Sequence, residues 1–195
     1  MYFTAAQQTT EGQRQGLARL YKVFADAQLS GFHPGDSYNR TVDCDEVYPG
    51  IFIGDDNSAR KKDTLVHLGI THVLNSAEGR EFGQVDTGPQ FYRDVGIAYR
   101  GFDLMDLPHV RICQHFEAGA NFIDLALQRG KVLVHCLMGM SRSATMVLAY
   151  LILKKGMTTE EALRTILRRR AVRPNDGFLL QLLELEQKMK DSKRK

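Results

Sequence analysis

The feature that most constrains the fold is a ten-residue stretch, HCLMGMSRSA, at positions 135–144. It follows a short apolar run, residues 131–134, that is typical of a buried strand, and it precedes a helix-forming segment at residues 145–153. A strand, a tight loop and a helix in that order form an anion-binding site, because backbone N–H groups turn inward and the helix N-terminus carries partial positive charge. Cys136 and Arg142, six residues apart, would then face the same bound phosphate.

The residue types in this loop point to thiolate chemistry on a phosphate ester. A free thiol is mostly protonated at neutral pH, but amides, a helix N-terminus and a guanidinium favour the thiolate, so we expect Cys136 to be the nucleophile. Arg142 suits bidentate contact with phosphate oxygens through the transition state. Gly139 permits a turn that a side chain would obstruct. The Ser143 hydroxyl would donate to the sulfur as it leaves the phosphoenzyme, and His135 would lie beneath the loop and fix its shape.

The remaining loop residues supply backbone and shape. The phosphate is expected to contact Leu137, Met138, Gly139, Met140, Ser141 and Arg142. Leu137, Met138 and Met140 have no chemistry of their own and would form the pocket rim. The alternative is that Cys136 is a buried structural cysteine, since cysteine is commonly buried. The Cys-x5-Arg spacing, with His, Gly and Ser around it, disfavours that alternative.

Cleavage of a phosphate ester also needs a proton for the leaving oxygen. A carboxylic acid on a separate loop is the expected donor, and the loop after a strand predicted at 97–102 offers Asp103 and Asp106. That strand could lie beside the strand at 131–134, which would bring both loops to one sheet edge. The residue pattern alone does not choose between the two aspartates, and one of them could simply cap the loop.

Strand and helix patterns alternate along the rest of the chain, which indicates α/β layers around one sheet in a single domain. Further extended segments are predicted at 47–54, around a Pro-Gly turn, and at 71–75. Further helices are predicted at 17–24, at 57–68, from 116 to near Gly130, from 158, and at 178–189. In the first helix, Leu17, Leu20, Tyr21 and Phe24 share one face, and a loop at 30–36 ends it. Thr158 and Glu161 form a capping box. His72 alternates with apolar residues and is interpreted as a satisfied strand histidine.

We divide the chain into a flexible N-terminus (1–12), one catalytic domain (13–190) and a basic tail (191–195). No apolar run reaches membrane-spanning length and no export signal precedes the domain, so we expect a cytoplasmic protein, with the nucleus as a second location. Three scattered cysteines fit a reducing compartment and match no zinc-ligand spacing. The net charge of +3 is small, and no aromatic stacking pattern accompanies the basic residues, which disfavours nucleic-acid binding.

The motif His135-Cys136-x-x-Gly139-x-Ser141-Arg142-Ser143 is identified as the signature of cysteine-dependent protein phosphatases. Residues 47–189 resemble the small, atypical dual-specificity branch, and most of all the VHR-type phosphatases. The supporting stretches are 68–75, 77–80, 122–124 and 174–179. The resemblance implies a central mixed, mostly parallel sheet of about five strands flanked by helices. It also implies a reaction that uses no metal or other cofactor.

The resemblance adds two expectations about individual residues. In that family the general acid stands seven residues after the tyrosine of the preceding strand, which from Tyr99 lands on Asp106. Arg170 is expected to recognise an acidic or second phosphorylated residue of the substrate, with a solvated helix charge as the alternative. Met138 and Met140 replace residues that are polar or aromatic in some relatives, so rim specificity is not transferred.

Together these points predict a dual-specificity phosphatase for phosphotyrosine and phosphoserine or phosphothreonine that works through a cysteinyl-phosphate. The expected partners are phosphorylated proteins, with mitogen-activated protein kinases as a family expectation, and neither nucleic acid nor membrane. We expect a monomer or weak dimer. The alternatives are a phosphoprotein-binding scaffold without turnover and a phosphatase acting on RNA or lipid phosphates.

Overall fold

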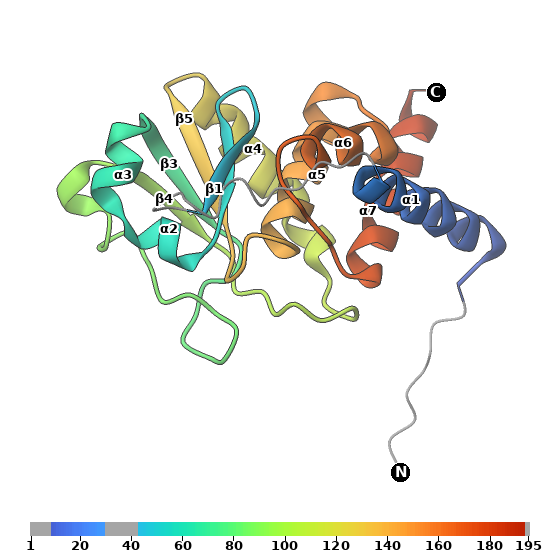
Figure 1. Cartoon of the computed structure of the whole chain (residues 1–195), viewed down its shortest axis with the longest axis horizontal. Helices are drawn as coiled ribbons and strands as arrows, with labels where there is room; N and C mark the ends of the chain where they lie inside the picture. The colour runs from blue at the N-terminus through green and yellow to red at the C-terminus, as the bar shows by residue number, and fades with distance from the viewer. Residues whose placement is uncertain (1–8, 30–42, 194–195) are drawn as a thin grey trace, which may run out of the picture.

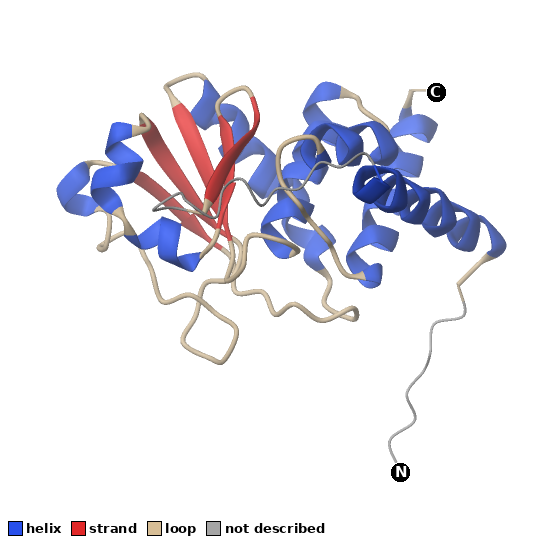
Figure 2. Ribbon diagram, in the orientation of Figure 1, coloured by secondary structure: helices blue, strands red, loops and turns tan. Residues whose placement is uncertain are grey.

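The computed structural model describes residues 9–29 and 43–193, which form an α/β structure (Figures 1 and 2). The strands are β1 (Cys44–Tyr48), β2 (Ile51–Gly54), β3 (Ile70–Asn75), β4 (Ala98–Gly101) and β5 (Lys131–His135). The α-helices are α1 (Glu11–Leu29), α2 (Asp56–Arg60), α3 (Lys62–His67), α4 (Phe116–Leu127), α5 (Arg142–Lys155), α6 (Thr159–Leu167) and α7 (Asp176–Ser192). Short 3-10 helices cover Arg93–Val95 and Ile112–His115.

The five strands form one sheet in the order β1-β2-β5-β3-β4. Only β1 is antiparallel to its neighbour, and the other pairings are parallel. The predicted mixed, mostly parallel sheet is therefore confirmed. The expectation that the strand at 97–102 lies beside the strand at 131–134 is wrong, because β3 separates β4 from β5.

The register of the parallel strands nevertheless brings their following loops together. His135 at the end of β5 pairs with Gly54 of β2 and with Asn75 of β3, and Asn75 pairs in turn with Gly101 of β4. Because these strands are parallel and end at the same level, the loops that leave them start at a single sheet edge. The predicted acid loop and phosphate loop thus open on the same side, as expected, although their strands are not neighbours.

Alternating side chains of the sheet divide the apolar interior into two layers. Val132 and Val134 of β5 belong to the larger cluster with α4 and α5, whereas Leu133 belongs to a smaller cluster on the other face with residues of α2 and α3. Figure 2 shows helices on both sides of the strands. Every residue of α5 from 142 to 152 is buried, because α4, α6, α7 and the sheet surround this helix.

Several local predictions can be compared with the structure. The helix predicted at 57–68 is two helices, because the backbone of Lys61 (φ −86°, ψ 71°) leaves the helical region between them. The Thr158–Glu161 capping box is present at the start of α6. His72 is 6% exposed, with Nδ1 2.8 Å from the Thr71 hydroxyl, as a satisfied strand histidine should be. Burial, with Arg129 nearby, lowers the pKa of His72.

Helix α1 packs through Leu20, Val23 and Phe24, all of which are buried. Tyr21, predicted on the same face, is 36% exposed, because it lies at the edge of that face beside Arg173. The helix begins at Glu11, inside the segment assigned to the N-terminus. The remainder of that segment up to residue 8, the loop predicted at 30–36 and the last two residues of the tail lie outside the described residues.

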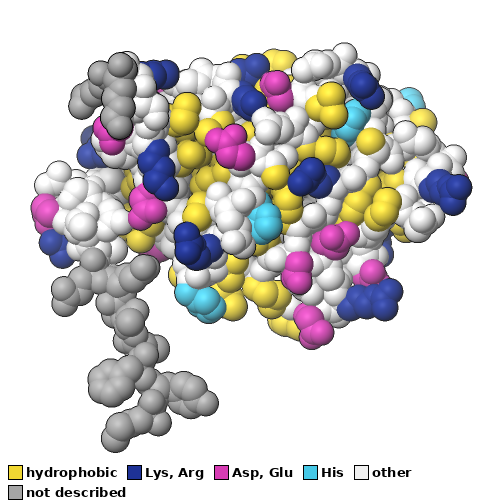
Figure 3. Space-filling model, turned by 180° about the vertical axis from the view of Figure 1, so that it is seen from behind, with side chains coloured by type: hydrophobic (Ala, Val, Ile, Leu, Met, Phe, Trp, Pro, Cys, Tyr) yellow, Lys and Arg dark blue, Asp and Glu magenta, His cyan; other side chains and the backbone are white. Residues whose placement is uncertain are grey.

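On the face seen in Figure 3, basic and acidic side chains lie interspersed with apolar ones. None of the described helices combines the length and apolar character that a membrane span requires.

Candidate active site

The phosphate loop, residues 136–141, runs from the end of β5 to the start of α5 at the shared sheet edge. Its turn depends on Gly139, which has a φ of 65°. A Cβ at this position would lie 2.6 Å from the carbonyl oxygen of Gly54 at the end of β2. Both the backbone angle and the close approach therefore require glycine, as the sequence predicted.

Hydrogen bonds turn the backbone carbonyls of residues 135–141 away from the centre of the loop. Each of these carbonyls has a partner at hydrogen-bond distance: the N–H groups of Ser76, Asp56, Arg173 and Thr145, the imidazole of His135 and the guanidinium of Arg170. Within the described chain, none of the N–H groups of residues 137–141 donates to another residue. The loop consequently presents unused amide donors to an anion.

Cys136 lies at the start of this loop and is 1% exposed. Its sulfur is 3.3 Å from the hydroxyl of Ser143, which is buried in the first turn of α5. The helix begins after Ser141, so its positive end is directed toward the same region. The structure thus places a thiol, a hydroxyl that can donate to it and a helix N-terminus together.

Arg142 is held by one edge of its guanidinium. Its Nη1 donates to the carbonyl oxygens of Gly83 and Leu104, at 2.9 Å each. Nε and Nη2 donate to none of the described residues, and Nε is buried. The outer edge of the fork therefore makes no hydrogen bond within the described chain, although Asp106 lies at ion-pair distance from Nε, and this edge can donate to two oxygens of a phosphoryl group. The sequence could not identify Gly83 and Leu104, because the groups that act are backbone carbonyls, which every residue carries.

The structure separates the two candidate acids. Asp106 accepts hydrogen bonds from the hydroxyl of Ser141 at 2.7 Å and from Nδ2 of Asn175 at 2.8 Å. Its other carboxylate oxygen lies 3.7 Å from Nε of Arg142, and its side chain is 34% exposed. Asp103 is exposed and accepts from the side-chain amide of Gln84 instead. Asp106, and not Asp103, lies against the phosphate loop.

Asn175 is a contributor that the sequence analysis did not identify. Its Oδ1 accepts from the N–H of Phe178 and caps α7, while its Nδ2 holds Asp106. In the sequence, the stretch 174–179 contributed only to the family resemblance. An asparagine immediately before a helix is a signal for the cap, but the contact with Asp106 depends on tertiary structure.

His135 lies beneath the loop and is fully buried. Its Nδ1 is 3.3 Å from the carbonyl oxygen of Cys136, and its Nε2 has no partner among the described residues. Burial lowers the pKa of the imidazole to about 4, so the ring is neutral near pH 7. A neutral, enclosed ring suits a residue that shapes the loop better than one that transfers protons.

This buried imidazole predicts a specific loss of stability in acid. The unfolded chain protonates His135 near pH 6.5, whereas the folded chain resists until about pH 4. As the pH falls through that interval the unfolded state binds more protons, so the free energy of unfolding should fall by up to about 1.4 kcal/mol per pH unit from this residue. Urea unfolding of the wild type and of His135→Asn, which keeps a nitrogen near Nδ1, measures the contribution. Parallel pH profiles of the two proteins between pH 4 and 6.5 would contradict it.

The alternative interpretation of Arg170, as a solvated helix charge, is wrong. The residue is 4% exposed, so it is not a solvated helix charge, and it lies beyond the end of α6. Its Nε donates to the carbonyl of Gly139, and its remaining nitrogens bond to Met138 O and to the carboxylates of Asp43 and Asp45. Burial opposes the charge, but the two carboxylates outweigh it and raise the pKa of the guanidinium. Its donors are used inside the protein, which suits a residue that supports the loop, and its predicted role in substrate recognition stays a prediction.

Replacement of Arg170 should therefore impair catalysis on every substrate. In Arg170→Met two loop carbonyls lose their donor and Asp43 and Asp45 lose their cation, so kcat for a small aryl phosphate should fall about 10- to 100-fold through misplacement of the loop. The affinity for inorganic phosphate should fall with it. Arg169→Met, at the exposed neighbouring arginine, is the matched control. A loss confined to the KM of phosphopeptides would instead support substrate recognition by Arg170.

The cysteines of the described chain are all free thiols. Among the described residues, no group of three or more His, Cys, Asp or Glu side chains is arranged to hold a metal ion.

Comparison with known proteins adds independent information. The family described as "Dual specificity phosphatase, catalytic domain" matches residues 51–188. The structure resembles human DUSP28, with 26% identity over 75% of this chain and 95% of that chain (TM-score 0.65). It resembles the Yvh1 phosphatase domain from Chaetomium thermophilum, with 26% identity over 75% and 96% (TM-score 0.66). It also resembles the human tyrosine phosphatase-like serine/threonine/tyrosine-interacting protein, with 34% identity over 75% and 97% (TM-score 0.62).

Proposed function

The chain belongs to the dual specificity phosphatase family and is a protein phosphatase, and we propose that it hydrolyses phosphotyrosine, phosphoserine and phosphothreonine through a cysteinyl-phosphate intermediate. The observation that carries the proposal is the convergence of three groups on one anion site. Cys136 lies at the start of a loop of unused N–H groups, Arg142 offers the free edge of its guanidinium, and Asp106 lies against the loop.

In the first step the Cys136 thiolate attacks phosphorus and the bond from phosphorus to the leaving oxygen breaks. Inward N–H groups and the outer edge of Arg142 hold the charge on the three non-bridging oxygens. Asp106 gives its proton to the leaving oxygen, which becomes a neutral alcohol or phenol. The dephosphorylated residue departs and the phosphoryl group stays on sulfur.

In the second step water attacks phosphorus on the side that the leaving group vacated. Asp106, now a carboxylate, takes a proton from that water, and the phosphorus–sulfur bond breaks to release inorganic phosphate. The Ser143 hydroxyl, 3.3 Å from the sulfur, donates to the thiolate as it forms. Cys136 is then again a thiolate and Asp106 again a carboxylic acid, as before the first step.

A second candidate function is phosphoprotein binding without turnover. It is favoured by the 34% identity to a protein described as tyrosine phosphatase-like and interacting. Against this function, the chain keeps the thiol of Cys136, the guanidinium of Arg142 and the carboxylate of Asp106 in one site. A protein that only binds phosphoproteins would most simply arise by loss of one of these groups. A third candidate function is action on RNA or lipid phosphates. The phosphate loop contains no lysine that would support it.

A side-by-side assay decides between these functions. The full chain is incubated with phosphotyrosine, phosphoserine and phosphothreonine peptides, with phosphoinositides and with RNA bearing a 5′-triphosphate, and phosphate release is measured. Release from the peptides in preference to the other two classes supports the proposal. Peptide binding without release would establish the scaffold function, and preferential release from lipid or RNA would reassign the substrate.

The biological setting is a further part of the proposal. Free Cys44, Cys113 and Cys136 support a reducing compartment, the cytoplasm or the nucleus. Phosphorylated mitogen-activated protein kinases belong in the panel of protein substrates, and we propose that the enzyme works as a monomer or weak dimer.

A further inference from the structure

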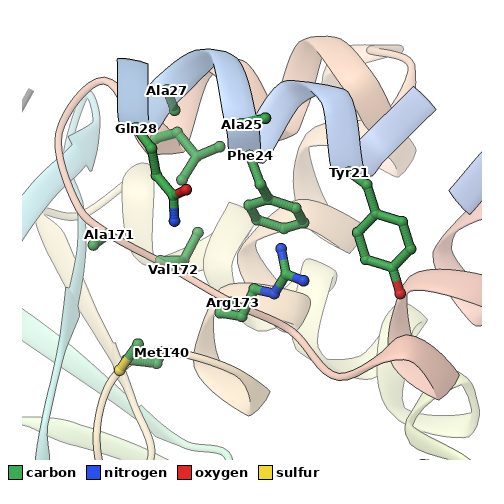
Figure 4. A pocket seen from close by; sticks show the side chains of 10 residues that line it. Tyr21, Phe24, Ala25, Ala27, Gln28, Met140, Ala171, Val172 and Arg173 are labelled. Atoms are coloured by element: carbon green, nitrogen blue, oxygen red, sulfur yellow. The ribbon is translucent and has the colours of Figure 1, made fainter. Parts of the chain in front are cut away.

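A pocket of about 630 Å³ opens beside the phosphate loop, between α1 and the chain segment that follows α6 (Figure 4). It is lined by Tyr21, Phe24, Ala25, Ala27, Gln28, Met140, Leu167, Ala171, Val172 and Arg173. We propose that this pocket binds the substrate polypeptide next to the phosphorylated residue, taking an apolar side chain into its interior and an acidic side chain onto Arg173. The inference rests on the proposed phosphoprotein phosphatase function and specifies its substrate class.

Arg173 supplies the charge of the pocket and connects it to the phosphate loop. Its backbone N–H donates to the carbonyl of Met140 at 2.9 Å. The Cζ atom of its guanidinium lies 4.3 Å from the ring centroid of Phe24 and 5.2 Å from that of Tyr21. Figure 4 shows the guanidinium beside the Phe24 ring. Stacking on aromatic faces fixes the plane of a guanidinium without using its N–H donors.

Those donors have no partner in the described chain. The guanidinium groups of Arg142 and Arg170 donate to carbonyls and carboxylates of the protein. The guanidinium of Arg173, in contrast, makes no hydrogen bond or ion pair with a described residue. The nearby Asp176 carboxylate interacts with the hydroxyl of Tyr21 instead. Burial, and to a smaller extent Asp176, raises the pKa of that hydroxyl. A fixed arginine with unused donors in a partly enclosed pocket suits a carboxylate or a second phosphoryl group of a ligand.

The rest of the lining is apolar and leaves room for a side chain. Small residues, among them Ala25, Ala27 and Ala171, form much of the wall, and Leu167 and Val172 add branched aliphatic surface. A volume of about 630 Å³ lies within the range of roughly 300–1,000 Å³ that is typical of small-molecule sites, so the pocket has room for a side chain of a bound peptide. An apolar side chain next to an acidic one therefore matches both the walls and the charge.

The position of the pocket identifies the occupant as substrate. Met140 belongs both to the pocket and to the phosphate loop, four residues after Cys136. Consecutive Cα atoms are about 3.8 Å apart, so these two Cα atoms are separated by at most ~15 Å, a span that about four residues of extended peptide cover. A peptide whose phosphorylated residue occupies the loop thus reaches the pocket within about four positions.

Family membership does not assign this pocket. The family match begins at residue 51, whereas α1, which provides half of the lining, ends at Leu29. The subsite accordingly includes residues outside the family match, and its specificity has to be measured on this chain.

The test compares two phosphotyrosine peptides that differ only in their flanks. One carries an apolar and an acidic residue within four positions on each side, and the other carries glycine and serine there. The measured quantity is the ratio of their kcat/KM values in each protein, so that any general change in catalytic power cancels. For the wild type we expect a preference of about tenfold for the apolar-acidic peptide, the size of one charge-assisted hydrogen bond.

Three variants locate the preference. Arg173→Met removes the charge while keeping an unbranched chain, and Ala25→Phe fills the pocket from its exposed side. Both should bring the ratio close to one, while Arg169→Met, which removes an exposed charge outside the pocket, should keep the wild-type ratio. Replacing the acidic residue by a non-hydrolysable phosphonate analogue of phosphoserine shows whether a phosphoryl group serves as well as a carboxylate.

Several results would overturn the proposal. A wild-type ratio near one, an unchanged ratio in both pocket variants, or an equal loss in Arg169→Met would each show that the pocket does not select substrates. If a second copy of the chain fills the pocket, Ala25→Phe would shift the sedimentation coefficient and not the peptide ratio. Failure of the proposed function would look different, because both peptides would then remain phosphorylated in every protein.

Discussion

Replacing Cys136 by serine is expected to lower kcat for a small aryl phosphate by at least about 10⁴-fold. Serine is nearly the same shape, so the phosphate loop and its carbonyl contacts should persist. A hydroxyl, however, is far harder to ionise than a thiol, and the inward amides and helix N-terminus that favour a thiolate cannot make a serine alkoxide at neutral pH. The measurement is steady-state release of the phenol, with phosphopeptide binding followed by calorimetry.

Phosphopeptide binding by Cys136→Ser distinguishes a loss of the chemical step from a loss of structure. Cys136→Ser should still bind a phosphopeptide, because the N–H groups and the Arg142 edge remain in place. Cys113→Ser, at a half-buried thiol in a different part of the chain, is the matched control and should keep full activity. Wild-type turnover by Cys136→Ser would exclude the covalent mechanism. Trapping labelled phosphate on Cys136 after rapid acid quench would support the mechanism directly.

The phosphate loop and the architecture around it could be predicted because their signals are local. The spacing of Cys136 and Arg142, the glycine between them and the flanking strand and helix patterns all lie within one short stretch. Alternation in strands and the helical period predicted most other elements, and parallel strands bring their carboxyl ends to one edge whatever their order. This is why the residue pattern predicts both loops at one sheet edge, where they start, although β3 separates the two strands that were predicted to be neighbours.

The parts that the sequence could not supply depend on contacts between distant segments. Arg170 reaches Asp43 across 127 positions, and this pairing turns what looks like a surface arginine into a buried support of the loop. Arg142 is fixed by backbone carbonyls, which leave no trace in a residue pattern. The choice between Asp103 and Asp106 likewise depends on Ser141 and Asn175 on other elements; from residues alone it stayed open.

Removal of the Asp106 carboxylic acid should have the second largest effect on catalysis. Asp106→Asn keeps an oxygen that can accept from Ser141 and Asn175, so the loop geometry is preserved while the transferable proton is lost. We expect kcat for phosphoserine and phosphothreonine peptides to fall about 10³-fold, because an alkoxide is a poor leaving group without protonation. The fall for an aryl phosphate with an acidic phenol should be much smaller, since that phenolate leaves unaided.

This dependence on the leaving group distinguishes a general acid from a residue that only positions the loop. A positioning residue would slow all substrates by a similar factor, because each depends on the same phosphate contacts. Asp103→Asn is the matched control: it removes a carboxylate three residues away, on the same loop, and should leave kcat close to wild type because its partner is the side-chain amide of Gln84, outside the phosphate loop. A larger loss in Asp103→Asn than in Asp106→Asn would reassign the acid, and equal losses with every leaving group would remove Asp106 from proton transfer.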